Sequence, residues 1–484
     1  MSDERSSSKS FNLVTEPWIP VLYADGRWER VGIRKALTDA GQIRQIAASN
    51  PMDRVSLIRF LLAILYWCKG NPPGPEDRTR LVGTGRFPAE WFVKLHQQNA
   101  RFDLLGSAQR FCQDASARRP RPATDLIQEV PTGNNFWHLR HSTDYRDGLC
   151  PACCALGLLR LPLFSVSGLP DLRSGINGTP PIYVVPLGGS LLETLCLNWI
   201  ESASLGMPAW EAPVPPSPQG EPVPLLTGLT LLSRRVLLDD PAPPKGACVA
   251  CGDVRPALIR TCKFQSAGSQ ANEAWNDPHV VYRSATKRST FRAPDLSAPQ
   301  KFKMDKPWWK VLAEIASSNR FQPGPAVRTL LIVGFATDQA KNVDVWECVC
   351  SVPPGACGDG GSVKVADRLH EWEAASDRIP SRLKTVPNRK HVELHAVMHM
   401  VRPNIESCIS ASAPRILSNS DEAWQQAVAL HGEAMSMIAA PLAPGFTTKA
   451  IERRRQIANT VPPLTSEHAA DTPCGIRAKK GRAR

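Results

Sequence analysis

Cys150-Pro-Ala-Cys153 and Cys248-Val-Ala-Cys251-Gly252 are two C-x2-C pairs that lie far apart in this chain. This spacing lets two thiolates converge on one tetrahedral Zn2+, and a glycine commonly follows a zinc knuckle. If both pairs bind the same ion, the two ends of the intervening segment are held together. The pattern therefore predicts a structural four-cysteine zinc site that staples the middle of the protein.

Other interpretations of these cysteines stay open. The sequence has 14 cysteines among 484 residues, and a free cysteine often serves as a small buried apolar residue. The two pairs could be unrelated buried or redox pairs, or part of different metal chemistry. Cys154 and Cys262 are further thiols that could replace a ligand. Four thiolates leave no open coordination position, so a zinc of this kind is not expected to be catalytic.

Length and composition indicate a folded protein of two or three domains. Of its 484 residues, 42% are hydrophobic. The polar start lacks the apolar segment of a secretory signal. The strongest apolar stretch, residues 57–68, carries Arg59 and is too short to span a bilayer. We therefore expect a cytoplasmic protein without a membrane partner, in which the cysteines are reduced or bound to metal.

Basic residues outnumber acidic ones. The net charge of +13 and a pI near 9.2 favour a polyanionic partner such as nucleic acid. One basic cluster, Arg118 to Arg121, lies in an extended segment, and another ends the chain at residues 477–484. The terminal cluster can track phosphates, or it can be a solvated end without a specific role.

Apolar periodicity and turn signals predict mixed secondary structure. Residues 11–23 form a strand interrupted by prolines, and residues 28–33 are its partner after a turn at Asp25-Gly26. We expect helices at residues 36–47 and from Asn50-Pro51 onward, and a connection around residues 70–88. Further expected elements are a helix at 155–163, a strand at 182–187, a helix at 191–199 and a strand pair at 328–335 and 343–349.

The last part of the chain has a helical pattern. Apolar stripes recur at Val365, Leu369 and Trp372, at residues 394–401 and at residues 424–438, and a basic helix follows at 449–458. We therefore predict an α+β protein: a mixed α/β amino-terminal domain with a four-cysteine zinc staple, followed by a carboxy-terminal four-helix bundle. The predicted boundaries are a disordered start at 1–10, the mixed domain at 11–355, the bundle at 356–462 and a basic disordered tail at 463–484.

Catalytic motifs are absent from the sequence. It contains no Walker A loop, no G-x-G-x-x-G after a strand, no H-E-x-x-H and no G-x-S-x-G. The row His391, His395 and His399, with Glu393 nearby, places three imidazoles on one face of a helix, but the third lies two turns from the first. We expect this row to be structural or exposed to solvent. A metal-dependent nucleic-acid enzyme that uses it, or a zinc-ribbon structural protein, are the alternative functions.

Several separated motifs together resemble one family, the CasA large subunit of the type I-E CRISPR Cascade surveillance complex. Beside the cysteine pairs, the segments that carry the resemblance are Phe11-Asn-Leu with Trp18-Ile-Pro-Val, Gly133-Asn-Asn-Phe136, Ser174-Gly-Ile-Asn-Gly178-Thr-Pro, Cys262-Lys263 and Gly334-Phe-Ala-Thr-Asp-Gln339-Ala. Their common order covers residues 11–345, whereas the helical end matches the family in pattern alone.

The resemblance implies a reader of duplex DNA that does not cut it. Members of the family inspect the protospacer-adjacent motif and start the strand separation that lets guide RNA pair with its target (R-loop formation). Carried over by motif, Lys263 would reach the minor groove. Gln339, with Thr337 and Asp338, would form a wedge that parts the first base pair. Lys449 and Arg453 of the helical end would hold DNA phosphates or contact small subunits.

The resemblance also implies partners. Asn135, Phe136 and Trp137 would meet the guide RNA and a neighbouring subunit, although aromatic residues in a loop are otherwise more often buried. The expected partners are double-stranded target DNA, guide RNA, the backbone, small and RNA 5′-end subunits of Cascade, and a helicase-nuclease that this subunit recruits.

One loop departs from the family pattern. Where the family often has a run of glycines, this chain has Ser167-Gly168-Leu-Pro170-Asp-Leu-Arg173. Pro170 cannot donate a backbone amide. A DNA contact from Gly168, or from Arg173 in place of the backbone, is the expectation for this loop.

Overall fold

The computed structural model describes the chain in two compact units. Unit 1 comprises Met1–Met304 and Thr329–Cys350, and unit 2 comprises Asp305–Arg328 and Ser351–Arg484. The described residues are 10–107, 109–127, 147–165, 175–178, 180–211, 221–266, 275–283, 298–299, 328–338, 341–352, 365, 367–369, 371–372, 411–412, 415–418, 420–442, 447–449 and 451–452. Each unit is described by itself below.

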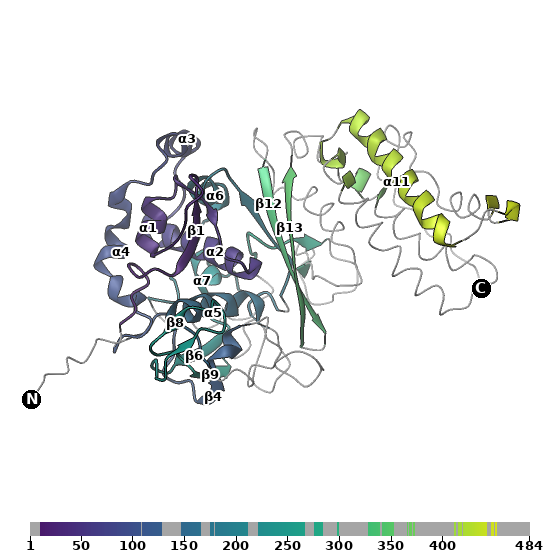
Figure 1. The fold of residues 1–484 in the computed structure, drawn as a ribbon. Helices are drawn as coiled ribbons and strands as arrows, with labels where there is room; N and C mark the ends of the chain where they lie inside the picture. Colours follow the sequence, from purple (N-terminus) through teal and green to yellow (C-terminus); the bar gives the residue numbers. More distant parts are fainter. Residues whose placement is uncertain are drawn as a thin grey trace, which may run out of the picture. The chain divides into compact units, whose positions relative to one another are not determined.

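Helix α2 (Pro51–Lys69) is the centre of the core of unit 1 (Figure 1). It begins as its sequence predicts, because the side chain of Asn50 accepts a hydrogen bond of 2.8 Å from the Met52 amide and Pro51 occupies the first helical position. It ends at Gly70, whose φ is +87°. Since 15 of its 19 residues are buried, the helix is enclosed on all sides. It packs against α5 (Pro151–Phe164), α6 (Leu191–Asn198) and α7 (Leu225–Thr230).

The amino-terminal sheet has the strand order β2-β1-β3. The predicted hairpin is confirmed: β1 (Ile19–Tyr23) pairs antiparallel with β2 (Trp28–Val31). The helix expected at residues 36–47 is wrong in its second half. Helix α1 (Ile33–Thr38) ends after six residues, and β3 (Ile43–Ile46) then pairs with the open edge of β1, which buries Ile43 and Ile46. Pairing with a distant strand outweighs the local helical pattern here.

Residues 70–88 contain a helix, α3 (Pro75–Thr84), where we expected a connection. Its start and stop signals are ordinary: proline at the first position, Glu76 and Asp77 in the first turn, and Gly85 in the left-handed conformation after the last residue. Because Leu81 is its one buried residue, the helix shows little apolar periodicity.

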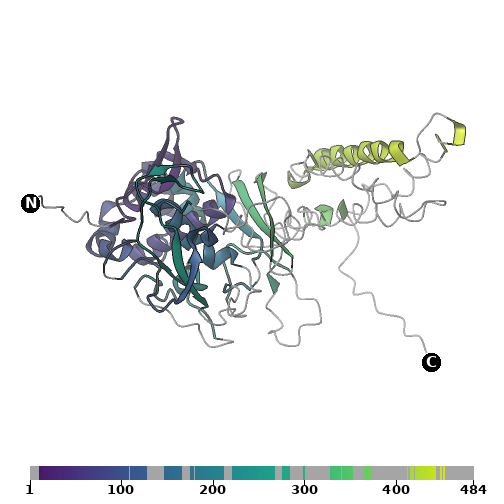
Figure 2. The same cartoon turned by 60° about the horizontal axis from the view of Figure 1, so that its bottom comes forward.

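The first of two further three-stranded sheets confirms the predicted strands at 182–187, 328–335 and 343–349, whereas the strands at 234–238 and 261–266 in the second sheet were not predicted. In the first, β12 (Arg328–Asp338) lies between β13 (Lys341–Val352) and β5 (Tyr183–Leu187), with Leu331 opposite Val185; Figures 1 and 2 show the long β12–β13 pair. In the second, β9 (Thr261–Ser266) lies between β4 (Arg119–Pro122) and β6 (Arg234–Leu238).

The remaining elements of unit 1 are short. They are the helical turns η1 (Ala89–Phe92), α4 (Val93–Gln97), η2 (Asn99–Phe102) and η3 (Ala123–Leu126), and the strand pairs β7 (Gly246–Ala247) with β8 (Val254–Arg255) and β10 (Tyr282–Arg283) with β11 (Ala298–Pro299). With the sheets above, they make the unit a mixed α and β structure.

Two buried ion pairs tie other segments to α2. Arg160 of α5 donates to Asp53 from Nε at 2.8 Å and from Nη2 at 2.7 Å. Arg59 donates to Asp277 at 2.6 and 2.9 Å, and both side chains are at most 2% exposed. Burial acts to raise the pKa of Asp277, but the charge and hydrogen bonds of Arg59 lower it to about 2. Asp277 is therefore an anion that matches the Arg59 cation.

Apart from the ends of β12 and β13, the described part of unit 2 is mostly helical. Val365, Leu369 and Trp372 are buried in a helical segment, and α11 (Asp421–Leu442) buries Trp424 and His431. The Trp372 and His431 rings lie 5.0 Å apart. The first predicted stripe and the part of the third from Trp424 to His431 are thus confirmed and pack together. The side chains of residues 434–442, residues 394–401 and most of 449–458 lie outside the described part of the chain. Within the described ranges, no helix is long and apolar enough to cross a membrane.

We predict that Arg59→Met lowers the free energy of unfolding by about 3–5 kcal/mol, because it leaves the Asp277 carboxylate buried without its countercharge. Chemical denaturation followed by tryptophan fluorescence measures the change. Arg80→Met is the matched control. The Arg80–Asp77 pair is 3.2 Å long with side chains 75% and 58% exposed, so its loss should cost less than about 1 kcal/mol. Equal losses in the two variants would contradict the assignment of Arg59.

Candidate metal centre and nucleic-acid interface

The two cysteine pairs occupy two kinds of local structure. Cys150 is the N-cap of α5 and Cys153 lies in its first turn, where the helix dipole favours thiolate. Cys248 and Cys251 lie in the turn that joins β7 to β8. Gly252 has a φ of +76°, a conformation that favours glycine. The Gly252 amide donates to the Cys248 carbonyl at 2.8 Å, which closes the turn around the two thiols.

Backbone hydrogen bonds join the two pairs directly. The amide of Cys150 donates to the sulfur of Cys248 at 3.2 Å, and the amide of Val249 donates to the carbonyl of Gly148 at 3.1 Å. Leu149 and Ile259 exchange two hydrogen bonds of 2.8 and 2.9 Å. A Cβ on Gly148 would lie 2.1 Å from the carbonyl oxygen of Ile259, so glycine permits this close approach.

The four thiols have the geometry of a zinc site. The sulfurs of Cys150, Cys153, Cys248 and Cys251 all lie within 4.8 Å of one another, and those of Cys150 and Cys251 are 3.7 Å apart. Tetrahedral zinc with a Zn–S distance of about 2.3 Å needs sulfurs about 3.8 Å apart. The four cysteines therefore form one cluster that could bind a metal such as zinc, as their spacing predicts.

The other thiols near the knuckles stand outside this cluster. Cys154 is buried one residue further along α5, and the Cys262 sulfur lies 3.6–3.7 Å from the carbonyl oxygens of Arg121 and Pro122. Burial raises the pKa of both. In the cluster, hydrogen bonds from the Cys150 and Cys153 thiols lower the pKa of Cys248 and lower that of Cys251 to about 6. The same network of hydrogen bonds raises the pKa of Cys150 and Cys153. Without a metal the four thiols therefore share protons, which a zinc ion would displace because it binds the thiolate form.

Lys263 lies on the middle strand of the β4-β9-β6 sheet. Its antiparallel partners are Pro120 and Leu237, and it is partly exposed, whereas its neighbours Cys262 and Phe264 are buried on the other face. The strand begins two residues after Ile259, which is hydrogen-bonded to Leu149, the residue before the first knuckle. A short, paired segment thus joins the four-cysteine cluster to Lys263.

Two of the three predicted wedge residues lie at the end of β12. Thr337 and Asp338 end β12, and β13 resumes at Lys341. Gln339 lies outside the described residues. Lys449 is exposed in a short helical stretch. The remaining predicted residues also lie outside the described part of the chain: Asn135, Phe136, Trp137, Gly168, Arg173, Arg453 and the row His391, Glu393, His395 and His399.

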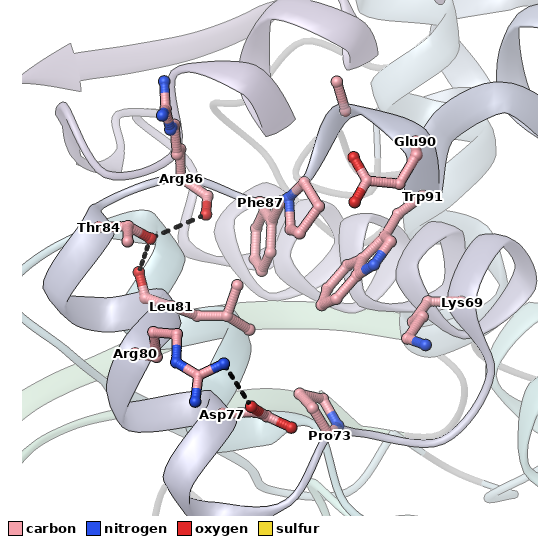
Figure 3. A pocket seen from close by; sticks show the side chains of 12 residues that line it. Lys69, Pro73, Asp77, Arg80, Leu81, Thr84, Arg86, Phe87, Glu90 and Trp91 are labelled. Atoms are coloured by element: carbon pink, nitrogen blue, oxygen red, sulfur yellow. Dashed lines mark hydrogen bonds and ion pairs between the residues drawn. The ribbon is translucent and has the colours of Figure 1, made fainter.

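A ligand-sized pocket lies between α3 and the end of α2 (Figure 3). Its volume is about 520 Å³. Phe87 and Trp91 line one side, Lys69 approaches the Trp91 ring at 5.3 Å, and Arg80 pairs with Asp77 at 3.2 Å. The lining contains no histidine, serine or cysteine and no predicted site residue. Because the sequence pattern did not reveal α3, it did not reveal this pocket, although the capping signals of α3 could have done so.

Sequence reasoning also missed Arg30. This residue of β2 forms an ion pair with Asp253, which follows the second knuckle, across 223 positions of sequence. Nothing local in the sequence marks Arg30 as a neighbour of the cysteines.

Comparisons with known proteins agree on one family. A family model described as CRISPR-associated protein Cse1 matches residues 12–398. CRISPR-associated protein CasA/Cse1 of Thermus thermophilus is 34% identical over 218 residues. That match spans 43% of this chain and 43% of the relative.

Solved structures share the fold over almost the whole chain. CasA of Thermus thermophilus superposes with a TM-score of 0.70 at 19% identity, covering 93% of this chain and 99% of that one. Cse1 of Acidimicrobium ferrooxidans gives a TM-score of 0.68 at 18% identity, covering 93% and 98%. A chain of a CRISPR RNA-guided surveillance complex gives 0.68 at 16% identity, covering 93% and 99%.

We predict that the purified protein carries about one zinc per chain and that Cys251→Ser loses it, because one of the four ligands is removed. Metal analysis by mass spectrometry measures the zinc content. Cys154→Ala is the control, since this buried thiol adjoins the cluster without belonging to it. Retention of stoichiometric zinc by Cys251→Ser would show that the cluster is not the metal site.

Proposed function

Because the chain belongs to the CRISPR-associated Cse1 family, also called CasA, the large subunit of the type I-E Cascade surveillance complex, we propose that it recognises a short motif in duplex DNA. In this proposal it also begins strand separation, so that the guide RNA can pair with the target. The observation that carries the proposal is the position of Lys263: partly exposed, in the middle of a sheet, and joined to the four-cysteine cluster through Ile259.

A lysine suits minor-groove recognition. The minor groove presents the N3 and O2 acceptors of A·T and T·A pairs alike, so a single flexible donor can recognise them without a bidentate match. The neighbours of Lys263 on β9 pair on both sides with β4 and β6. The lysine therefore projects from a fixed backbone, which lowers the entropy lost when it binds.

Other cations surround Lys263 on the same sheet. Arg235 of β6 is opposite Gln265, two residues from Lys263, and Arg118 precedes β4. Both are at least partly exposed. Asp114, which lies 3.5 Å from Arg235, offsets part of this charge. The remaining positive charge supports contacts with DNA phosphates, which orient a protein on the duplex without reading its sequence.

The β12–β13 hairpin supports a wedge. Strands of 11 and 12 residues with β5 alongside form a stiff support for a wedge at the end of β12, where Gln339 follows next in the sequence. Parting a base step costs a few kcal/mol. Guide pairing repays this cost when it follows at once, because the RNA–DNA duplex is about as stable as the DNA duplex that it replaces.

The proposed subunit recognises nucleic acid without cutting it. Four cysteines around one metal leave no open position for a reacting water, so the cluster fits a structural role. We propose guide RNA, the other Cascade subunits and a recruited helicase-nuclease as partners, with Asn135, Phe136 and Trp137 on the guide-RNA side. Gly168 and Arg173 remain proposed DNA contacts, and a carboxy-terminal four-helix bundle at 356–462 would hold DNA through Lys449 and Arg453.

We predict that Lys263→Ala weakens binding of duplex target by the assembled complex by about 1–3 kcal/mol, because a groove contact is lost. Binding of a target that is already unwound should change little. Gel-shift titration at fixed salt measures both affinities. Lys245→Ala, which removes an exposed lysine before β7, should leave both affinities near those of the unchanged protein.

Gln339→Ala tests the wedge in the same assay. It should slow R-loop formation on duplex DNA, as followed by a base-analogue fluorophore beside the motif, and leave the unwound target unaffected. Equal losses on duplex and unwound targets for both variants would contradict the proposed function, because they would place the defect after strand separation.

A further inference from the structure

The β4-β9-β6 sheet has one buried face and one partly exposed face. Cys262 and Phe264 of β9 and Val236 of β6 are at most 7% exposed and lie on the buried face. Because side chains alternate along a strand, Lys263 and Gln265 both point to the other face, and each is partly exposed. A ligand that reaches Lys263 therefore meets Gln265 as well.

The two polar neighbours of Lys263 along this face differ in their hydrogen bonding. The hydroxyl of Thr261 donates to the carboxylate of Asp239. The carboxamide oxygen of Gln265, in contrast, is buried and has no hydrogen-bond partner among the residues that the structure describes. Buried polar atoms are rarely left without a partner. Because no hydrogen bond holds this oxygen, the amide can turn toward the exposed face and bond to a ligand there.

Two arginines flank Gln265 on the neighbouring strands. Arg235 of β6 is its antiparallel partner. On the other side, Arg118 lies one residue before the pair formed by Arg119 and Phe264, which places it next to Gln265. Adjacent strands lie about 4.8 Å apart, so the two arginine backbones are about 10 Å apart. The minor groove of DNA is about 6 Å wide, and two long cationic side chains at this separation can reach the phosphates on its two sides.

The spacing of Lys263 and Gln265 suits one short motif. Residues i and i+2 of a strand lie about 6.7 Å apart, close to two base-pair steps of about 3.4 Å. The lysine ammonium can only donate hydrogen bonds, whereas a carboxamide donates and accepts. In the minor groove A·T pairs present acceptors alone, and G·C pairs add the N2 amino group of guanine. A carboxamide oxygen can accept a hydrogen bond from that amino group, which a lysine cannot do.

We propose that Gln265 is a second base-reading residue, which distinguishes G·C from A·T pairs in the minor groove beside Lys263. Arg118 and Arg235 hold the phosphates on the two sides of the groove and orient the duplex. This role rests on the proposed function, since it requires duplex DNA on this sheet. It adds a discrimination between the two kinds of base pair that Lys263 alone cannot supply.

Binding of the assembled complex to a panel of duplex targets tests the role of Gln265. The targets carry each of the four base pairs at every position of the motif, and gel-shift titration at fixed salt gives each affinity. We expect Gln265→Met, which keeps the length of the side chain and removes the amide, to lower the preference for G·C over A·T at one position about 3–10-fold, the usual effect of one lost hydrogen bond. Binding of a target that is already unwound should not change.

Thr261→Val is the matched control, because it removes a polar group from the same face whose hydrogen bond is already made within the protein. It should leave all base preferences unchanged. Base preferences that are also unchanged in Gln265→Met, or an equal loss on every target, would overturn the role of Gln265. Lys263→Ala in the same panel separates the two proposals: if it weakens duplex binding in that case, the proposed function stands without Gln265. If neither variant changes duplex binding, both proposals are wrong.

Discussion

Helix α2 carries two charged side chains, Asp53 and Arg59, into a core with almost no exposed surface, and much of unit 1 is arranged to neutralise them. An unpaired buried charge costs several kcal/mol, so each must meet its partner in the folded state. Arg160 brings α5 and the first cysteine pair to the helix. Asp277 brings residues 275–283, which in turn bond to β5 through Val280. The position of the four-cysteine cluster thus depends on charge pairing inside the core.

The four-cysteine cluster extends this arrangement toward the proposed DNA-reading sheet. α5 is fixed to α2, the second knuckle is fixed to α5 through Cys150 and Gly148, and β9 follows within a few residues of Ile259. Each of these connections consists of backbone hydrogen bonds or a buried ion pair. A metal in the cluster would therefore stabilise backbone segments that hydrogen bonds already hold together. It would affect Lys263 by fixing the position of β9 and not by a direct contact.

The sequence predicted features that depend on neighbouring residues better than those that depend on distant ones. The C-x2-C spacing predicted the cluster, Asn50-Pro51 predicted the start of α2, and an apolar run followed by a polar turn predicted the β12–β13 hairpin. Residues 43–46 became a strand because the edge of β1 was free to pair with them. The contact between Arg30 and the second knuckle crosses 223 positions, and no local pattern encodes it. The wedge tip and the guide-RNA loop remain predictions.

The pairing of Arg59 with Asp277 sets an order of events during protein synthesis. The two residues are 218 positions apart, and a ribosome adds roughly 5–20 residues per second. Helix α2 therefore leaves the ribosome roughly 10–40 s before the partner of its central charge exists. During that interval its apolar surface is without its final cover, which makes the nascent chain a natural client for a chaperone. Changes that slow translation between residues 59 and 277 should consequently reduce the yield of soluble protein even where the finished sequence is unaltered.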